Sequence, residues 1–445
     1  MYWFLLLFPL IIFPWGLESF STIPKLFSLY LFVLSTLVIL AYNRKYWVQN
    51  IQKRLTIAEK IICVLLLLIG VSTIFSINKT VAVIGFPTRF EGFLSLFSYC
   101  CIFLFSMRLM NAKQFKKIIP GFIAVSIILS VYGILQHYSL DFLPTNNPSN
   151  SSYIRSYGLF GNPNCYGSYL VLILLLSICL FFSEKGNKIK RFIFFTSCLT
   201  FLVMLFTGTR SSWVGLCFGL IFFTVFVILR RRYLWKRYSI LLISFFTIFI
   251  IVNSTEDGSY FNRFNSIISD SSKVLKKEET TGQEGSYRMF IWQKSLPLVK
   301  EYFWVGTGPD SFIFAFPNGD KETKEIFGDI KVDKAHNEYL QMAVTLGVPA
   351  LCVYFLLLFV ILRKAFQATR LIRGNEKIML YGLISTIIGY LAQAFFNISV
   401  VTVAPIYWSI LGITYGLSIH FLNNAKSQNH KETKTTEVSK IAMIN

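Results

Sequence analysis

The stretch 163-PNCYGSYLVLILLLSICLFF-182 holds twenty residues and no charged side chain. About 20 apolar residues in helical form cross a hydrocarbon core about 30 Å thick. Residues 184-EKGNKIKR-191 follow and contain four basic side chains. An uncharged run of this length that ends at a basic cluster is typical of a membrane-spanning helix.

The same pattern recurs along the chain. Of 445 residues, 54% are hydrophobic and only 15% are charged, which is more apolar surface than one soluble core buries. The sequence therefore predicts an all-α, polytopic bundle of about 12 transmembrane helices. The apolar runs lie near 3–17, 24–42, 59–77, 92–110, 118–137, 163–182, 192–208, 213–229, 238–253, 338–362, 378–397 and 400–421.

These runs divide the chain into four parts. We expect a first bundle over 1–253 with about nine spans and a long extracytoplasmic loop over 254–336. About three further spans occupy 337–421, and a polar cytoplasmic tail covers 422–445.

The basic residues predict the orientation of the bundle. Every alternate loop is basic, and together these loops and the tail hold 27 of the 43 Lys and Arg residues. Lys and Arg are enriched in short cytoplasmic loops, so both termini are predicted to be cytoplasmic. The net charge of +21 then indicates contact with anionic membrane lipid, and not nucleic-acid binding, because the basic residues are divided among many loops.

Polar residues cluster on the opposite, extracytoplasmic face. The first cluster is 89-RFEG-92, where Arg89 and Glu91 either face a substrate or form a surface pair at a helix N-terminus. The second contains Asn162 and Asn164 in the turn that opens the span at 163. These asparagines are either substrate-facing or part of an ordinary capped entry into the membrane.

Two further segments on this face each carry an arginine. In 207-TGTRSSW-213 the link between two spans is so short that Arg210 lies at the membrane boundary. In the long loop, apolar residues at helical spacing predict an amphipathic helix near 286–300 that carries Arg288. A guanidinium at this depth suits a phosphate or diphosphate group, although contact with lipid headgroups would also explain it.

His336 lies in 334-KAHNEYLQMAVTLGVP-349, where the chain re-enters the membrane next to Asn337. A lone histidine is usually structural, but imidazole titrates near pH 6.5 and can act on an alcohol at neutral pH. Eight cysteines and four histidines are scattered without metal-ligand spacing, so neither a metal site nor a cofactor is predicted.

Five of these features occur in a fixed order over about 158–350. They are the GNPN turn, the TGTR segment, the predicted helix with Arg288 and Trp292, the Gly-x-Gly turn at 306–308 and the HNEYLQ re-entry. In this order they resemble the O-antigen ligase/polymerase superfamily, membrane enzymes that transfer glycans from a polyprenyl-diphosphate carrier.

The resemblance implies a role for each matching residue. Arg210 and Arg288 would bind the diphosphate of an undecaprenyl-diphosphate-linked glycan, and His336 would assist attack by a hydroxyl of an acceptor sugar. The reaction would be metal-independent and would serve cell-surface polysaccharide synthesis in a bacterial cytoplasmic membrane. Possible substrate-facing residues are Arg89, Glu91, Asn162, Asn164 and Asn337.

A lipid-linked-oligosaccharide flippase or another transporter is the main alternative. Such a protein is expected to carry ionisable residues inside its spans or interrupted helix pairs. Here the interiors of the predicted spans are nearly free of charge, and the polar residues gather at one face. This distribution favours the transferase.

Overall fold

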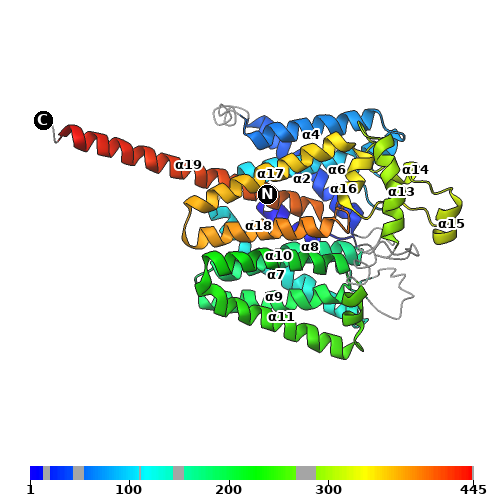
Figure 1. The fold of residues 1–445 in the computed structure, drawn as a ribbon, viewed down its shortest axis with the longest axis horizontal. Helices are drawn as coiled ribbons and strands as arrows, with labels where there is room; N and C mark the ends of the chain where they lie inside the picture. The colour runs from blue at the N-terminus through cyan, green and yellow to red at the C-terminus, as the bar shows by residue number, and fades with distance from the viewer. Residues whose placement is uncertain (14–20, 44–54, 110–111, 144–154, 267–286, 443–445) are drawn as a thin grey trace.

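The computed structural model describes residues 1–13, 21–43, 55–109, 112–143, 155–266 and 287–442, and within these ranges the regular elements are all helices (Figure 1). The long helices run side by side along one direction. The all-α membrane bundle predicted from the sequence is confirmed.

Nine helical segments of the described chain are long and apolar enough to cross a membrane. They are α2 (Thr22–Tyr42), α4 (Ile57–Ile74), the Pro120–His137 part of α7 (Ala112–His137), α8 (Pro163–Ser183), α9 (Asn187–Phe206), α10 (Arg210–Arg230), η2 (Arg232–Leu234) with α11 (Trp235–Thr255), α17 (Val348–Leu371) and α18 (Gly374–Ala394). The remaining bundle helices are the shorter apolar α6 (Phe93–Leu109) and α19 (Ala404–Ala442), whose first part is buried. Short elements are α1 (Tyr2–Leu7), η1 (Phe8–Leu10) and α5 (Lys79–Ile84).

The helix α8 forms the centre of one half of the bundle. It packs against α9, α10 and α18, and almost every side chain from Tyr166 to Phe182 is buried. A helix that is apolar on all sides can be buried either in lipid or among other helices, and α8 is buried among other helices. The uncharged run that predicted a span therefore becomes the core of the bundle.

Glycines allow two helix pairs to approach closely. A Cβ atom on Gly215 of α10 would lie 2.6 Å from the carbonyl oxygen of Gly389 of α18. In the same way, a Cβ on Gly416 of α19 would lie 2.5 Å from the carbonyl oxygen of Met107 of α6. Small residues at such crossings are the usual means of tight packing between membrane helices.

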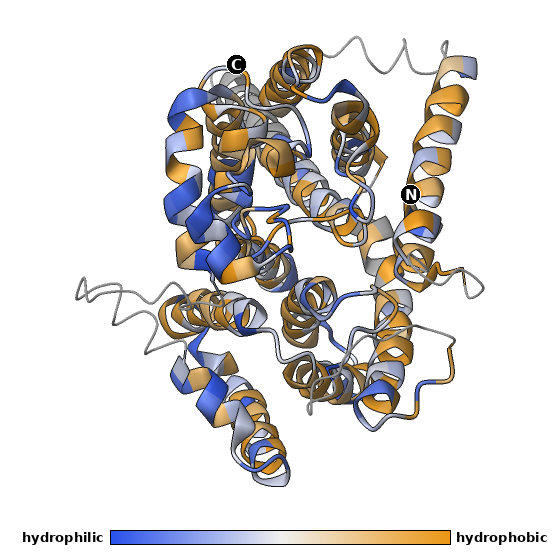
Figure 2. Cartoon of the chain, turned by 90° about the vertical axis from the view of Figure 1, so that its right-hand side faces the viewer, coloured by the Kyte–Doolittle hydropathy of each residue, from blue (hydrophilic) through white to orange (hydrophobic). Residues whose placement is uncertain are grey.

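A helical segment covers one end of the bundle, which we call the site end. It comprises α13 (Arg288–Glu301), α14 (Phe312–Ala315), α15 (Lys321–Phe327) and α16 (Glu338–Thr345), seen at the right of Figure 1. Figure 2 faces this end and shows hydrophilic residues on the covering segments, whereas the bundle helices are largely hydrophobic. The segment has a small core of its own, made by Phe290, Ile291, Leu298, Phe312, Phe316, Val332, Ala335 and Val344.

The structure changes the bounds of several predicted spans. The span predicted over 338–362 is divided, because Gly347 adopts φ +86 between α16 and α17 and only α17 has the length of a span. The span predicted over 3–17 is helical only to Leu10, and its last part lies outside the described residues. The final helix begins at Ala404 and continues through the predicted polar tail to Ala442.

Candidate functional site

In the turn before α8, the side chains of both asparagines of the GNPN sequence contact other residues of this chain. Asn162 is the N-cap, and its side-chain oxygen accepts a hydrogen bond from the backbone N–H of Asn164 at 2.8 Å. Pro163 fills the first helical position, where a missing N–H has no cost. Asn164 Oδ1 lies 3.4 Å from Nη2 of Arg155. Asn162 therefore serves as a helix cap, while Asn164 contacts an arginine.

Arg155 joins this turn to the TGTR loop. Its Nε donates to the carbonyl oxygen of Thr207 at 2.7 Å, and its Nη2 donates to Oγ1 of Thr209 at 3.1 Å. The guanidinium is thus fixed between the start of α8 and the start of α10. The sequence analysis did not select Arg155, because its position depends on contacts with residues more than fifty positions away.

Arg210 is the first residue of α10 and is half-buried. Its Nη1 donates to Oγ of Ser266 at 2.9 Å. The N-terminus of a helix carries a partial positive charge, so α10 adds to the attraction of Arg210 for an anion.

Arg288 is the first residue of α13 and is also half-buried. Its pKa is lowered to about 10, first by burial and then by repulsion from Arg210 and Arg155. Arg210 and Arg155 therefore both lie within electrostatic range of Arg288, whose guanidinium remains protonated at neutral pH. We call Arg155, Arg210 and Arg288 the arginine cluster.

His336 lies in the loop that leads into α16, with a left-handed backbone at φ +50. Burial, followed by the positive charges of Lys334, Arg288 and Arg89, lowers the pKa of His336 to about 3. The imidazole is therefore neutral at physiological pH. Its neighbourhood includes Arg288, which places it beside the arginine cluster.

Neighbouring helices hold the loop of His336 in place. Nε1 of Trp292 on α13 donates to the carbonyl oxygen of Ala335 at 2.9 Å, and the N–H of Ala335 donates to Oε1 of Gln341 on α16 at 2.8 Å. Asn337 is the N-cap of α16, and its side-chain oxygen accepts from the N–H groups of Tyr339 and Leu340. Asn337 thus has a structural role that fixes where α16 begins.

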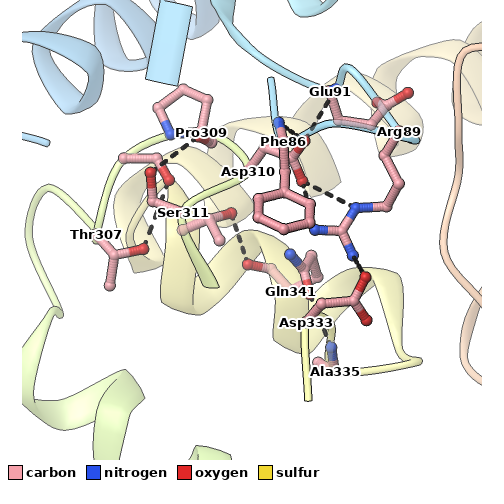
Figure 3. Close-up of polar contacts among 12 residues, drawn as sticks. Phe86, Arg89, Glu91, Thr307, Pro309, Asp310, Ser311, Asp333, Ala335 and Gln341 are labelled. Carbon is pink, nitrogen blue, oxygen red and sulfur yellow. Dashed lines mark hydrogen bonds and ion pairs between the residues drawn. The ribbon is translucent and has the colours of Figure 1, made fainter. Parts of the chain in front are cut away.

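Arg89 is engaged in buried ion pairs (Figure 3). Only 4% of its side chain is exposed, and its Nη1 lies 2.6 Å from Oδ2 of Asp333. Its Nε and Nη2 lie 3.2 and 3.0 Å from Oδ1 of Asp310, whose Oδ2 accepts from the backbone N–H groups of Phe86 and Glu91. These contacts tie the loop before α6 to the Gly-x-Gly turn, so Arg89 has a structural role.

The other charged residue of RFEG faces a different space. Glu91 accepts a hydrogen bond from the hydroxyl of Tyr99 at 2.7 Å, and burial raises the pKa of Glu91 well above its usual value. The carboxyl lines a cavity together with Glu338 of α16. Glu338 was not singled out from the sequence, although it lies directly after Asn337.

The structure thus gathers Arg210, Arg288 and His336 at the site end and adds Arg155 to them. Guanidiniums in this arrangement suit the oxygens of a phosphate or diphosphate. A neutral imidazole beside them can exchange hydrogen bonds with a hydroxyl group. Among the described residues, no three His, Cys, Asp or Glu side chains group in a way that could hold a metal ion.

Two comparisons with known proteins found similarity over part of the chain. Residues 195–355, which include Arg210, Arg288 and His336, match the model of the O-antigen ligase family. A curated relative, the general O-oligosaccharyltransferase of Acinetobacter baylyi, is 29% identical over 166 residues. The match covers 35% of this chain and 26% of the relative, so the chain aligns with about a quarter of that protein. This chain is a multi-pass membrane protein, and its residues 195–355 are similar to the O-antigen ligase family.

Proposed function

We propose that this protein transfers or polymerises a glycan carried on undecaprenyl diphosphate, joining it to a hydroxyl group of an acceptor sugar. The site end would face the extracytoplasmic side of a bacterial cytoplasmic membrane. The observation that carries the proposal is the arginine cluster beside the neutral imidazole of His336. The matched family and the transferase named among the relatives support it.

In the proposed reaction the arginine cluster binds the diphosphate of the donor. The cluster neutralises the negative charge that develops on the diphosphate as its bond to the anomeric carbon breaks. Because the diphosphate is a stabilised leaving group, the proposal includes no metal ion. Inversion at the anomeric carbon is expected for a single displacement.

His336 would activate or orient the attacking hydroxyl. In the protein without donor, burial and then the surrounding cations keep the pKa of His336 low. A bound diphosphate brings negative charge close to Arg288 and Lys334, which offsets their effect on the imidazole. Donor binding would therefore make His336 a better hydrogen-bond acceptor for the hydroxyl.

A reconstituted transfer assay tests the proposal. Purified protein in nanodiscs receives an undecaprenyl-diphosphate oligosaccharide and an acceptor glycan, and mass spectrometry follows the product. Arg210→Gln, Arg288→Gln and His336→Gln should each lower the rate about a hundredfold or more. Lys300→Gln, an exposed position on the same helix as Arg288, is the matched control and should retain activity. Full activity in the three variants would refute the assignment.

A further inference from the structure

A cavity of about 80 Å³ adjoins α16, the helix that begins two residues after His336. It is bounded by the residues before α6, by α6 itself, by α16 and by the start of α19. Its polar lining comes from three acidic residues and three neutral ones, and its aromatic lining includes Tyr99 and Trp408. The polar residues are Glu91, Asp310, Glu338, Gln341, Thr345 and Ser399. The arginine cluster contributes no side chain to this lining.

Glu338 has an unused oxygen in this cavity. The residue is 9% exposed, and its Oε2 is buried without a hydrogen-bond partner among the described residues. The backbone N–H of Ser399 interacts with the same carboxyl group. A buried carboxyl oxygen without a partner is costly, so its presence beside a polar cavity indicates that a ligand or water donates to it.

Glu91 contributes a second carboxyl group to the cavity. Its carboxyl is held by the hydroxyl of Tyr99 and lies within electrostatic range of Glu338. Two carboxyls in one poorly solvated space do not both ionise readily, and burial raises the pKa of Glu338 to about 8. In the described part of the chain, the lining of this cavity includes no cation that could pair with a diphosphate, whereas a neutral hydroxyl group can exchange hydrogen bonds with either carboxyl.

The backbone places this cavity next to the cationic site. Glu338 follows His336 by two residues, and two residues of chain span at most about 7 Å. The imidazole lies among cations that disfavour its protonation, while the carboxyl lies among groups that favour protonation. Of the two side chains, Glu338 is the better proton acceptor near neutral pH.

We propose that the cavity receives the hydroxyl group of the acceptor sugar and that Glu338 is the residue that accepts its proton. This inference rests on the transfer reaction proposed above. The hydroxyl oxygen forms a bond to the anomeric carbon, and the bond from that carbon to the diphosphate oxygen breaks with its electron pair leaving on the diphosphate. The hydroxyl proton passes to the ionised carboxylate of Glu338 and then to water. Trp408, which stacks near Tyr99 with ring centroids 6.4 Å apart, offers an apolar surface to the sugar ring.

The test separates the acceptor site from the donor site. In nanodiscs, Glu338→Gln should lower kcat about a hundredfold, while affinity for undecaprenyl diphosphate stays within about twofold of the unaltered protein. Arg288→Gln should instead lower that affinity. Glu325→Gln, an exposed carboxyl on α15, is the matched control and should change neither quantity.

The dependence of kcat on pH identifies the proton acceptor. Besides Glu91, the cavity is lined by Asp310, which is paired with Arg89, and by Tyr99. The phenols of Tyr339, Tyr354, Tyr390 and Tyr407 also lie within electrostatic range of Glu338, and phenols ordinarily titrate near pH 10. The rise of kcat with pH should persist in residual His336→Gln activity and disappear in Glu338→Gln. The opposite pattern would overturn this inference while leaving the proposed function in place. So would a Glu338→Gln variant that keeps kcat within threefold, or one that loses affinity for the donor. Absence of transfer by the unaltered protein would instead refute the proposed function, and this inference with it.

Discussion

Arg89 and Asp310 form a buried ion pair although they lie 221 positions apart in the chain, with Nη2 of the arginine 3.0 Å from Oδ1 of the aspartate. The pair joins the loop before α6 to the turn between α13 and α14. Burial raises the pKa of Asp310, and Arg89 with two backbone N–H groups opposes this effect only in part. This buried ion pair therefore joins the covering segment to the bundle.

Replacing Arg89 should destabilise the protein strongly. Arg89→Ala leaves the carboxylate of Asp310 buried without its cation, which typically costs about 3–5 kcal/mol. Thermal unfolding in detergent should show a large fall in the midpoint. Lys321→Ala removes an exposed ion pair with Glu325 and should cost at most about 1 kcal/mol. Equal midpoints for the two variants would contradict the structural role of Arg89.

Arg155 should contribute to anion binding although no motif pointed to it. Arg155→Gln is expected to weaken binding of inorganic pyrophosphate about tenfold, the effect of losing one charge-assisted hydrogen bond. Isothermal titration calorimetry at low and high salt measures this, and the affinity of the unaltered protein should fall as salt rises. Lys324→Gln on the exposed face of α15 provides the comparison. Unchanged pyrophosphate affinity in Arg155→Gln would remove Arg155 from the cluster.

His336 should make the folded protein sensitive to acid. Its pKa is about 3 in the folded state, against an ordinary value of 6.5, so the unfolded state binds more protons between these values. Stability should therefore fall as the pH is lowered from 6.5 towards 3. The unfolding midpoint of His336→Gln should decline less steeply over this window, as thermal scans at several pH values would show. Parallel curves for both proteins would indicate an unperturbed histidine.

The Asn337 cap should be replaceable by another capping residue. Asn337→Ala removes the acceptor for two backbone N–H groups and should cost about 1 kcal/mol, whereas Asn337→Ser should restore most of the loss. Chemical unfolding followed by tryptophan fluorescence gives the comparison. If serine restores stability but not transfer, the asparagine also contacts substrate.

Hydropathy and charge were sufficient to predict the class of fold and the helix that carries Arg288. The predicted range of 286–300 compares with Arg288–Glu301 in the structure. The break before α17 was not predicted, because hydropathy along the sequence stays apolar through Leu346 and Gly347. Only the left-handed backbone of Gly347 separates α16 from the following span.

The candidate site was predictable where the residues lie in recognisable segments. Arg210, Arg288 and His336 each occur beside a turn or at a helix start, which local sequence indicates. The roles of Arg89 and Glu338 depend on partners far along the chain, such as Asp310 and Glu91, and sequence spacing gives no information about such contacts.

The helix α10 begins at Arg210 and ends at Arg230, and its 21 residues extend about 30 Å. With α10 spanning the bilayer, Arg210 would lie at the depth of the lipid headgroups, and the proposed lipid-linked donor would keep its hydrocarbon tail in the bilayer. Such a donor is encountered by lateral diffusion in two dimensions. Its effective concentration is its mole fraction among the membrane lipids. Dilution of the surrounding solution would therefore leave the fraction of protein molecules that hold a donor unchanged.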